Sequence, residues 1–124
     1  MSNKNEATNI FYTLFTDFLE DLNRIRPNDN GLLLIQSAIL LVPKSTLVSQ
    51  FMTYTADISE KILERDESFL INNMHNYVDT TSFIGQEFER VKQIWLSKDI
   101  TEDTRDCIWD YLVALIKFGK IAIE

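Results

Sequence analysis

The only histidine of the chain, His75, is the first side chain that could serve catalysis. Asp79 follows it four residues later and could orient an imidazole that acts as a general base. Hydrolytic sites of this kind also need a nucleophile on a strained turn or an activated thiol beside the histidine. Because the sequence contains neither pattern, we interpret His75 as a surface or helix-end residue.

The segment from Asp103 to Asp110 gathers acidic side chains around the only cysteine. Asp103, Asp106 and Asp110 fall at i, i+3 and i+7, so their carboxylates line one helix face and could hold magnesium or calcium. Calcium loops, however, need closely spaced oxygens and a glycine turn. Cys107 has acidic neighbours, whereas a thiolate nucleophile needs a basic one. We expect a solvated acidic face with a structural thiol, and a metal-dependent enzyme is the less favoured alternative.

No other segment has the residue spacing of a catalytic or cofactor site. The sequence contains no glycine loop that could cradle a phosphate and no zinc-spaced set of cysteines and histidines. Glu87, Glu89 and Arg90 have the pattern of an ordinary exposed helix face. The sequence therefore predicts a protein that is not an enzyme and that binds neither a cofactor nor a metal.

The composition is that of an average globular domain with an acidic surface. The 124 residues are 45% hydrophobic and 25% charged, which predicts one domain with an independent core. A net charge of −7 repels phosphate backbones, so nucleic acid is a disfavoured partner. Three glycines and two prolines are too few for the many turns of an all-β fold.

The same sequence features predict the compartment. A single cysteine cannot form an intramolecular disulfide, which suits a reducing environment. The N-terminus lacks the charged-then-apolar pattern of a secretory signal. The strongest apolar run, residues 32–42, is shorter than the about 20 residues of a membrane span. We expect an intracellular protein that is neither secreted nor membrane-spanning.

Apolar periodicity predicts helices after a flexible segment of residues 1–5. A first helix covers about residues 6–26, with apolar side chains at three- and four-residue steps, and Pro27 ends it. Residues 31–42 are apolar nearly all round. A buried strand is one interpretation of this segment, but its length and its leucine content favour a central helix that is hidden on every side and ended by Pro43.

Cap residues predict the helices that follow. Ser45 or Thr46 can cap a helix over the segment to residue 63, with a kink or break near residues 53–57. Asp66 is expected to cap a short helix.

The last third of the chain is expected to contain a loop and two helices. Residues 76–82 form the most polar stretch and predict an ordered loop, and the next helix begins at Phe83 or Ile84. After a short linker over residues 98–100, Thr101 is expected to cap a long final helix.

The first and last helices carry more apolar surface than one neighbouring helix can cover. Trp109 is offset by about 100° from the stripe of Ile108 and Leu115. Either the last helix is central and surrounded, or this second face meets another chain through aromatic anchors. The side chains expected to form such a protein interface are Trp109, Arg105, Leu112, Ile116, Tyr12 and Leu19.

The C-terminal part of the chain resembles a known group of proteins. Ile94-Trp95 is followed by a Thr101-capped helix that contains Ile108-Trp109-Asp110-Tyr111-Leu112, and the segments 14–22 and 62–70 extend the likeness to about half of the chain. These patterns resemble uncharacterised small helical proteins of nucleocytoplasmic large DNA viruses and their algal relatives. Asp110 stands where that group usually has Lys or Asn, and the middle of the chain departs from the group's pattern. The resemblance implies a helical fold and a viral context, and it identifies no activity or functional residue.

These observations together predict an all-α fold. We expect a single compact bundle over residues 6–124, with five or six helices around a hydrophobic hairpin of residues 31–63 and a long C-terminal helix as a strut. The expected function is a non-enzymatic protein-interaction or structural component of a large DNA virus, located in the virion, the viral factory or the host cytoplasm. Its partner would be a viral protein or a second copy in a homo-oligomer. The alternative is a host-factor binder that modulates a signalling or cell-death pathway.

Overall fold

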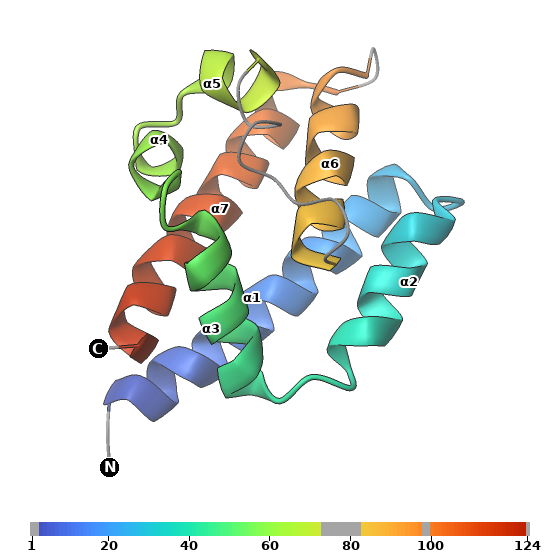
Figure 1. Cartoon of the computed structure of the whole chain (residues 1–124). Coiled ribbons are helices and arrows are strands. Elements are labelled where there is room, and N and C mark those ends of the chain that lie inside the picture. Colours follow the sequence, from blue (N-terminus) through green and yellow to red (C-terminus); the bar gives the residue numbers. More distant parts are fainter. Residues whose placement is uncertain (1–2, 73–82, 98–99, 124) are drawn as a thin grey trace.

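The computed structural model of the protein describes residues 3–72, 83–97 and 100–123. Within these ranges the chain forms seven α-helices and no β-strand (Figure 1), so the predicted all-α fold is confirmed. His75 and the predicted loop over residues 76–82 lie outside the described residues, as do residues 98–99 of the predicted linker.

Two long antiparallel helices form the centre of the bundle. Helix α1 (Asn3–Ile25) and helix α7 (Glu102–Ile123) make the most extensive helix contact in the described chain. The start of α1 lies beside the end of α7 in Figure 1. Gly119 of α7 leaves room for the Met52 side chain, because a Cβ there would lie 2.4 Å from Met52 Sδ, and the same Cβ would lie 3.4 Å from the Phe11 ring of α1. The predicted long C-terminal helix is confirmed.

Helix α1 buries one continuous stripe of side chains. Phe11, Phe15, Phe18 and Leu22, spaced by four, three and four residues, are all nearly completely buried. The helix ends at Ile25, as expected from the proline two residues later. It begins at Asn3, earlier than the predicted start near residue 6. No helix breaker stands in this segment, and the Thr8 hydroxyl donates to the Lys4 carbonyl at 2.7 Å.

The shorter helices α2 (Asn30–Ile39), α3 (Lys44–Thr55) and α6 (Phe83–Trp95) pack around this pair. Helix α3 packs extensively against α1, α6 and α7. Among the described helices, α2 packs extensively only against α1 and α6, and it lies at the edge of the molecule (Figure 1). The hairpin of residues 31–63 is therefore not the centre of the bundle, and that prediction is wrong. The longer helices, with more residues per apolar stripe, occupy the centre instead.

The segment after Pro43 contains two helices where the sequence predicts one with a break. Helix α3 begins directly at Lys44, because the Pro43 carbonyl accepts the first bond, from Leu47 N at 3.0 Å. The predicted caps Ser45 and Thr46 therefore lie inside the first turn, and that start is wrong. Thr55 Oγ1 donates to the Phe51 carbonyl at 2.9 Å near the end of α3. The predicted break is confirmed at residues 56–58, before α4 (Ser59–Leu63).

The remaining cap predictions are confirmed. Asp66 Oδ1 accepts from Phe69 N at 3.0 Å at the start of α5 (Glu67–Asn72). Thr101 Oγ1 accepts from Thr104 N at 3.2 Å at the start of α7. Arg65, with φ of 55°, allows the chain to reverse between α4 and α5.

The core is rich in aromatic rings. Phe51 of α3 packs against Phe11, Phe15 and Phe88 with ring centroids 5.2–6.2 Å apart, which joins α1, α3 and α6. Within the described ranges, no helix combines the length and the apolar character that crossing a bilayer requires.

Candidate protein-interaction surface

The apolar face predicted as an interface on α7 is enclosed by the chain's own helices. Leu112 and Ile116 have no exposed surface, and Trp109 is 6% exposed. Leu19 on α1 is likewise fully buried. The prediction that these four side chains lie at the surface is wrong, because α1, α3 and α4 each cover part of α7. Of the two interpretations of Trp109, the central and surrounded helix is the one observed.

Arg105 joins three helices rather than facing a partner. Its guanidinium lies over the Trp95 ring, with Cζ 5.5 Å from the ring centroid, and Nη2 donates to the Trp95 carbonyl at 3.4 Å. Glu67 Oε1 lies 3.8 Å from Arg105 Nη1 and accepts from Trp95 Nε1 at 3.1 Å. These contacts tie α5, α6 and α7 together.

Tyr12 is the other predicted interface residue that keeps some exposed surface. Lys44 Nζ lies 5.1 Å from the centroid of its ring. Tyr12 is next to Phe11, which packs near Gly119, whereas Arg105 lies roughly 20 Å away along α7. The structure therefore does not bring the six predicted side chains together into one surface.

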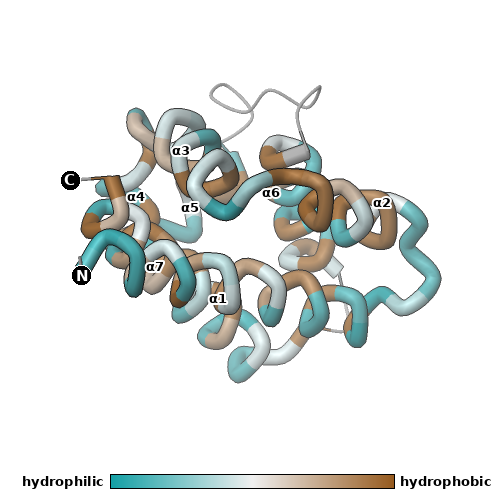
Figure 2. Tube along the Cα trace, turned by 90° about the horizontal axis from the view of Figure 1, so that it is seen from below, coloured by the Kyte–Doolittle hydropathy of each residue, from teal (hydrophilic) through white to brown (hydrophobic). Residues whose placement is uncertain are grey.

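An apolar surface does exist, but on α2. Leu33, Leu34, Leu40 and Leu41 are 43%, 68%, 74% and 87% exposed, and we call these four residues the α2 leucine surface. Figure 2 shows the hydrophobic colour running through α2, at the edge of the molecule, into its connection with α3. The inner face of α2 holds Leu32, Ile35 and Ile39, so apolar residues cover both sides of this helix.

This arrangement corrects the prediction of a helix hidden on every side. Residues 31–42 are apolar nearly all round, as predicted, but neighbouring helices cover only one side of α2. Exposed single leucines are common in proteins, whereas four neighbouring ones form an apolar patch of the kind that interaction sites use. The prediction of a central helix is wrong, and the reason is that its second apolar face has no neighbour among the described helices.

The acidic face of α7 is partly engaged in ion pairs. Asp110 Oδ1 accepts from Arg65 Nη2 at 2.6 Å, while Asp103 and Asp106 are exposed. Across the described ranges, no group of three or more His, Cys, Asp or Glu side chains lies close enough to hold a metal ion.

A hollow of about 400 Å³ lies between α1 and α7 beside Cys107. Its lining includes Tyr111, whose hydroxyl donates to Asp21 Oδ2 at 2.5 Å. Burial, followed by this hydrogen bond and the charge of Asp21, raises the pKa of Tyr111 above its usual value. The phenol therefore stays protonated and links the two helices, and the exposed Cys107 thiol stands at the rim.

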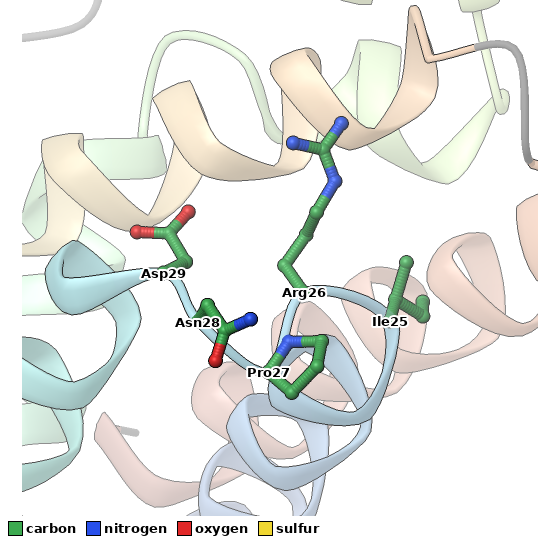
Figure 3. Close-up of a pocket in the computed structure, with 5 residues that line it drawn as sticks. All are labelled: Ile25, Arg26, Pro27, Asn28 and Asp29. Carbon is green, nitrogen blue, oxygen red and sulfur yellow. The ribbon is translucent and has the colours of Figure 1, made fainter.

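A second hollow, of about 350 Å³, lies at the turn between α1 and α2 (Figure 3). In Figure 3 the side chains of Arg26 and Asp29 both extend upward from this turn, and Pro27 and Asn28 lie below them. Asp29 Oδ1 is already engaged, since it accepts from Gly31 N at 2.9 Å and lies 3.6 Å from Arg90 Nε.

Glu87 is the functional candidate that the sequence pattern missed. It was expected on an exposed helix face, but its side chain has no exposed surface, so that prediction is wrong. Neither carboxylate oxygen has a hydrogen-bond partner in the described structure. Burial raises the pKa of Glu87 from 4.5 to about 8, so the carboxyl is mostly protonated at pH 7.

The surroundings of Glu87 explain why its carboxyl is neutral. Helix α6 packs on α2, which carries no charged residue, and on α3, whose buried side chains are apolar apart from Thr55. Arg90, one turn further along α6, lies beside Asp29 instead. The sequence contains a signal for this burial, because Glu87 stands three residues after Ile84 and four before Val91, inside the apolar stripe of α6.

No protein-family model, curated protein or solved structure matches the chain. Among the described residues, the α2 leucine surface holds the three most exposed large hydrophobic side chains, Leu41, Leu40 and Leu34.

Proposed function

We propose that the chain is a non-enzymatic protein-interaction or structural component of a large DNA virus, and that it acts in the virion or the viral factory. The observation that carries the proposal is the α2 leucine surface, whose four side chains are between 43% and 87% exposed. The predicted interface on α1 and α7 is thereby replaced with one on α2.

The exposed area of these leucines is large enough to contribute to binding. Burying one leucine side chain contributes about 1.5–3 kcal/mol, which corresponds to roughly 60–120 Å² of apolar surface. With the exposed fractions observed, the four leucines together could contribute on the order of 5 kcal/mol when a partner covers them. That amount offsets a large share of the free energy lost on association, which is about 4–15 kcal/mol.

A non-enzymatic role is also supported by the side chains that could take part in chemistry, because many of them form contacts that stabilise the fold. Asp110 pairs with Arg65, Tyr111 bonds Asp21, and Glu87 is enclosed where no substrate reaches it in this conformation. The viral context comes from the resemblance of the Ile94-Trp95 and Ile108-Trp109 segments to the small helical proteins of large DNA viruses.

Site-specific photo-crosslinking tests the interaction surface. A photoreactive amino acid is placed at Leu34, and the chain is irradiated in cells infected with the virus that encodes it. The matched control is position Leu96, a leucine at the end of α6 that is 57% exposed and lies outside the α2 leucine surface. We expect a covalent adduct with a protein from position 34 and none from position 96.

The mass of the adduct then identifies the kind of partner. Adducts of equal yield at both positions, or none at position 34, would contradict the proposed surface. The viral role is tested separately, by immunoelectron microscopy of infected cells and purified virions, and absence of the chain from both virions and factories would contradict it.

A further inference from the structure

The exposed leucines of α2 and of the turn that follows it are symmetric about Ser37. Leu33 and Leu41 lie four residues before and after this serine, and Leu34 and Leu40 lie three residues before and after it. On a helix, residues three and four positions apart share one face, which places Leu33, Leu34 and Ser37 together on α2. Leu40 is the C-cap of α2, with helical backbone angles of φ −65° and ψ −22°, and Leu41 N in the following turn donates to the Ala38 carbonyl at 3.1 Å. Because the chain keeps turning in the helical sense there, we place Leu40 and Leu41 on the same side as Ser37.

From this symmetry we propose that the α2 leucine surface binds a second copy of itself, as an antiparallel helix pair around a two-fold axis at Ser37. A two-fold interface requires a self-complementary surface, in which each contact occurs twice. In the antiparallel pair Leu33 meets the partner's Leu41, and Leu34 meets the partner's Leu40. The inference rests on the proposed interaction function and specifies its partner.

The residue at the axis is suited to close packing. Ser37 is small, and its hydroxyl donates to the Leu33 carbonyl at 3.0 Å. Because this bond lies within the helix, the hydroxyl keeps a partner when water leaves the interface. The centre of the surface can therefore be desolvated without stranding a polar group.

The α2 leucine surface carries no charge that would oppose a second copy. No charged residue stands between Asn30 and Pro43, although the chain as a whole has a net charge of −7. Two copies that meet through α2 bring no like charges together at the contact. Nucleic acids and anionic membranes bind through cationic side chains, and this surface offers none.

The exposed leucines supply part of the area that a small dimer buries. On two copies, the four leucines expose roughly 500 Å² of apolar surface. Standard interfaces bury about 1,200–2,000 Å² in total, and more than half of that area is apolar. The leucines thus supply most of the apolar area of an interface at the lower end of this range, and the polar rim around them supplies the rest, which predicts a weak to moderate dimer.

The test uses the purified full chain and measures its mass by sedimentation equilibrium from about 5 to about 500 μM, a range that spans moderate affinities. We expect the mass to rise from the 14.5 kDa of one chain towards twice that value. Leu34→Glu combined with Leu41→Glu should keep the chain monomeric over the whole range. Leu96→Glu, the matched control, should dimerise as the original chain does, and circular dichroism confirms that each variant is folded.

The position of the axis is tested by disulfide formation. In a Cys107→Ser background, Ser37→Cys should form an intermolecular disulfide on mild oxidation, since both copies of residue 37 meet at the axis. Ser49→Cys, at an exposed position of α3, should not.

Three results would overturn the inference: a monomer at every concentration, a dimer that survives the two glutamates, or a leucine-dependent dimer without a disulfide at position 37. A monomer in solution together with a photo-adduct between Leu34 and a different protein in cells would overturn the self-pairing alone. The proposed function would then stand, so the two failures are distinguishable.

Discussion

At the scale of single residues, Glu87 is the most unusual group in the described chain. A carboxylate without a partner is costly to bury, and the protein avoids that cost by keeping the proton on. The neutral carboxyl still leaves both oxygens without hydrogen bonds, so this site lowers the stability of the fold. The consequence is a dependence of stability on pH that can be attributed to one side chain.

We predict that Glu87→Gln stabilises the protein at pH 8 and has little effect at pH 5. The pKa of Glu87 is about 8 in the folded chain and near 4.5 when unfolded, so the folded state binds more protons between these values. The protonated carboxyl therefore contributes to the free energy of unfolding at low pH, and this contribution is lost as the pH rises towards and through the pKa of the folded state. Glutamine cannot ionise, and we expect it to add about 3 kcal/mol more stability at pH 8 than at pH 5.

Urea unfolding at several pH values measures this difference. Glu89→Gln, a less buried neighbour on the same helix, is the matched control and should follow the original chain at every pH. If the Glu87→Gln and original curves ran parallel from pH 5 to pH 8, ionisation of Glu87 would not be the cause.

At the scale of elements, Asp29 connects the start of α2 to α6. Its carboxylate accepts from Gly31 N at 2.9 Å and Leu32 N at 3.4 Å, which caps α2. The same oxygen lies 3.6 Å from Arg90 Nε. A Cβ at Gly31 would lie 2.2 Å from Arg90 Nη2, so glycine at this position leaves room for the guanidinium. The edge helix is therefore held by a cap and an ion pair as well as by its inner apolar face.

We predict that Asp29→Ala lowers the free energy of unfolding by about 1–2 kcal/mol, because it removes the helix cap and the partner of Arg90. Asp29→Asn keeps a good cap and loses only the charge, so its effect should be less than about 1 kcal/mol. Thermal unfolding of both variants checks the order. An equal loss in the two would show that the ion pair, not the cap, holds α2.

At the scale of the whole molecule, the bundle leaves one of its most apolar helices at the edge. The long helices α1 and α7 bury their surplus faces against each other and against α3 and α4. Among the described helices, α2 has neighbours on its inner side only, and its outer leucines are exposed. A second copy of the chain would bury the α2 leucine surface, which the described part of a single chain leaves exposed.

We predict that the melting temperature rises with protein concentration. Dimerisation stabilises only the folded state, so a hundredfold increase in concentration above the dissociation constant should raise the midpoint by roughly 4 °C. Differential scanning calorimetry at several concentrations measures the shift. The variant with Leu34→Glu and Leu41→Glu should show a constant midpoint, and a rise of the same size in that variant would contradict a stabilising role for α2.

Much of the fold could be predicted from the sequence because its signals are local. Pro27 ends α1, and the side chains of Asp66 and Thr101 accept hydrogen bonds from backbone amides in the first turns of α5 and α7. Apolar residues at three- and four-residue steps mark the helices. Such signals act within a few residues of the chain, so they can be recognised without knowledge of its neighbours. The all-α class and the long C-terminal helix follow from them.

Only the tertiary structure decides which apolar faces are covered. Trp109 and Leu34 both belong to apolar faces in sequence, yet Trp109 is 6% exposed and Leu34 is 68% exposed. Glu87 sits in an apolar stripe and is enclosed together with it. Burial depends on which helices pack side by side, and that pairing is a property of the whole chain. For this reason the sequence alone determined the helices of this protein, whereas their packing decided that its exposed apolar surface lies on α2.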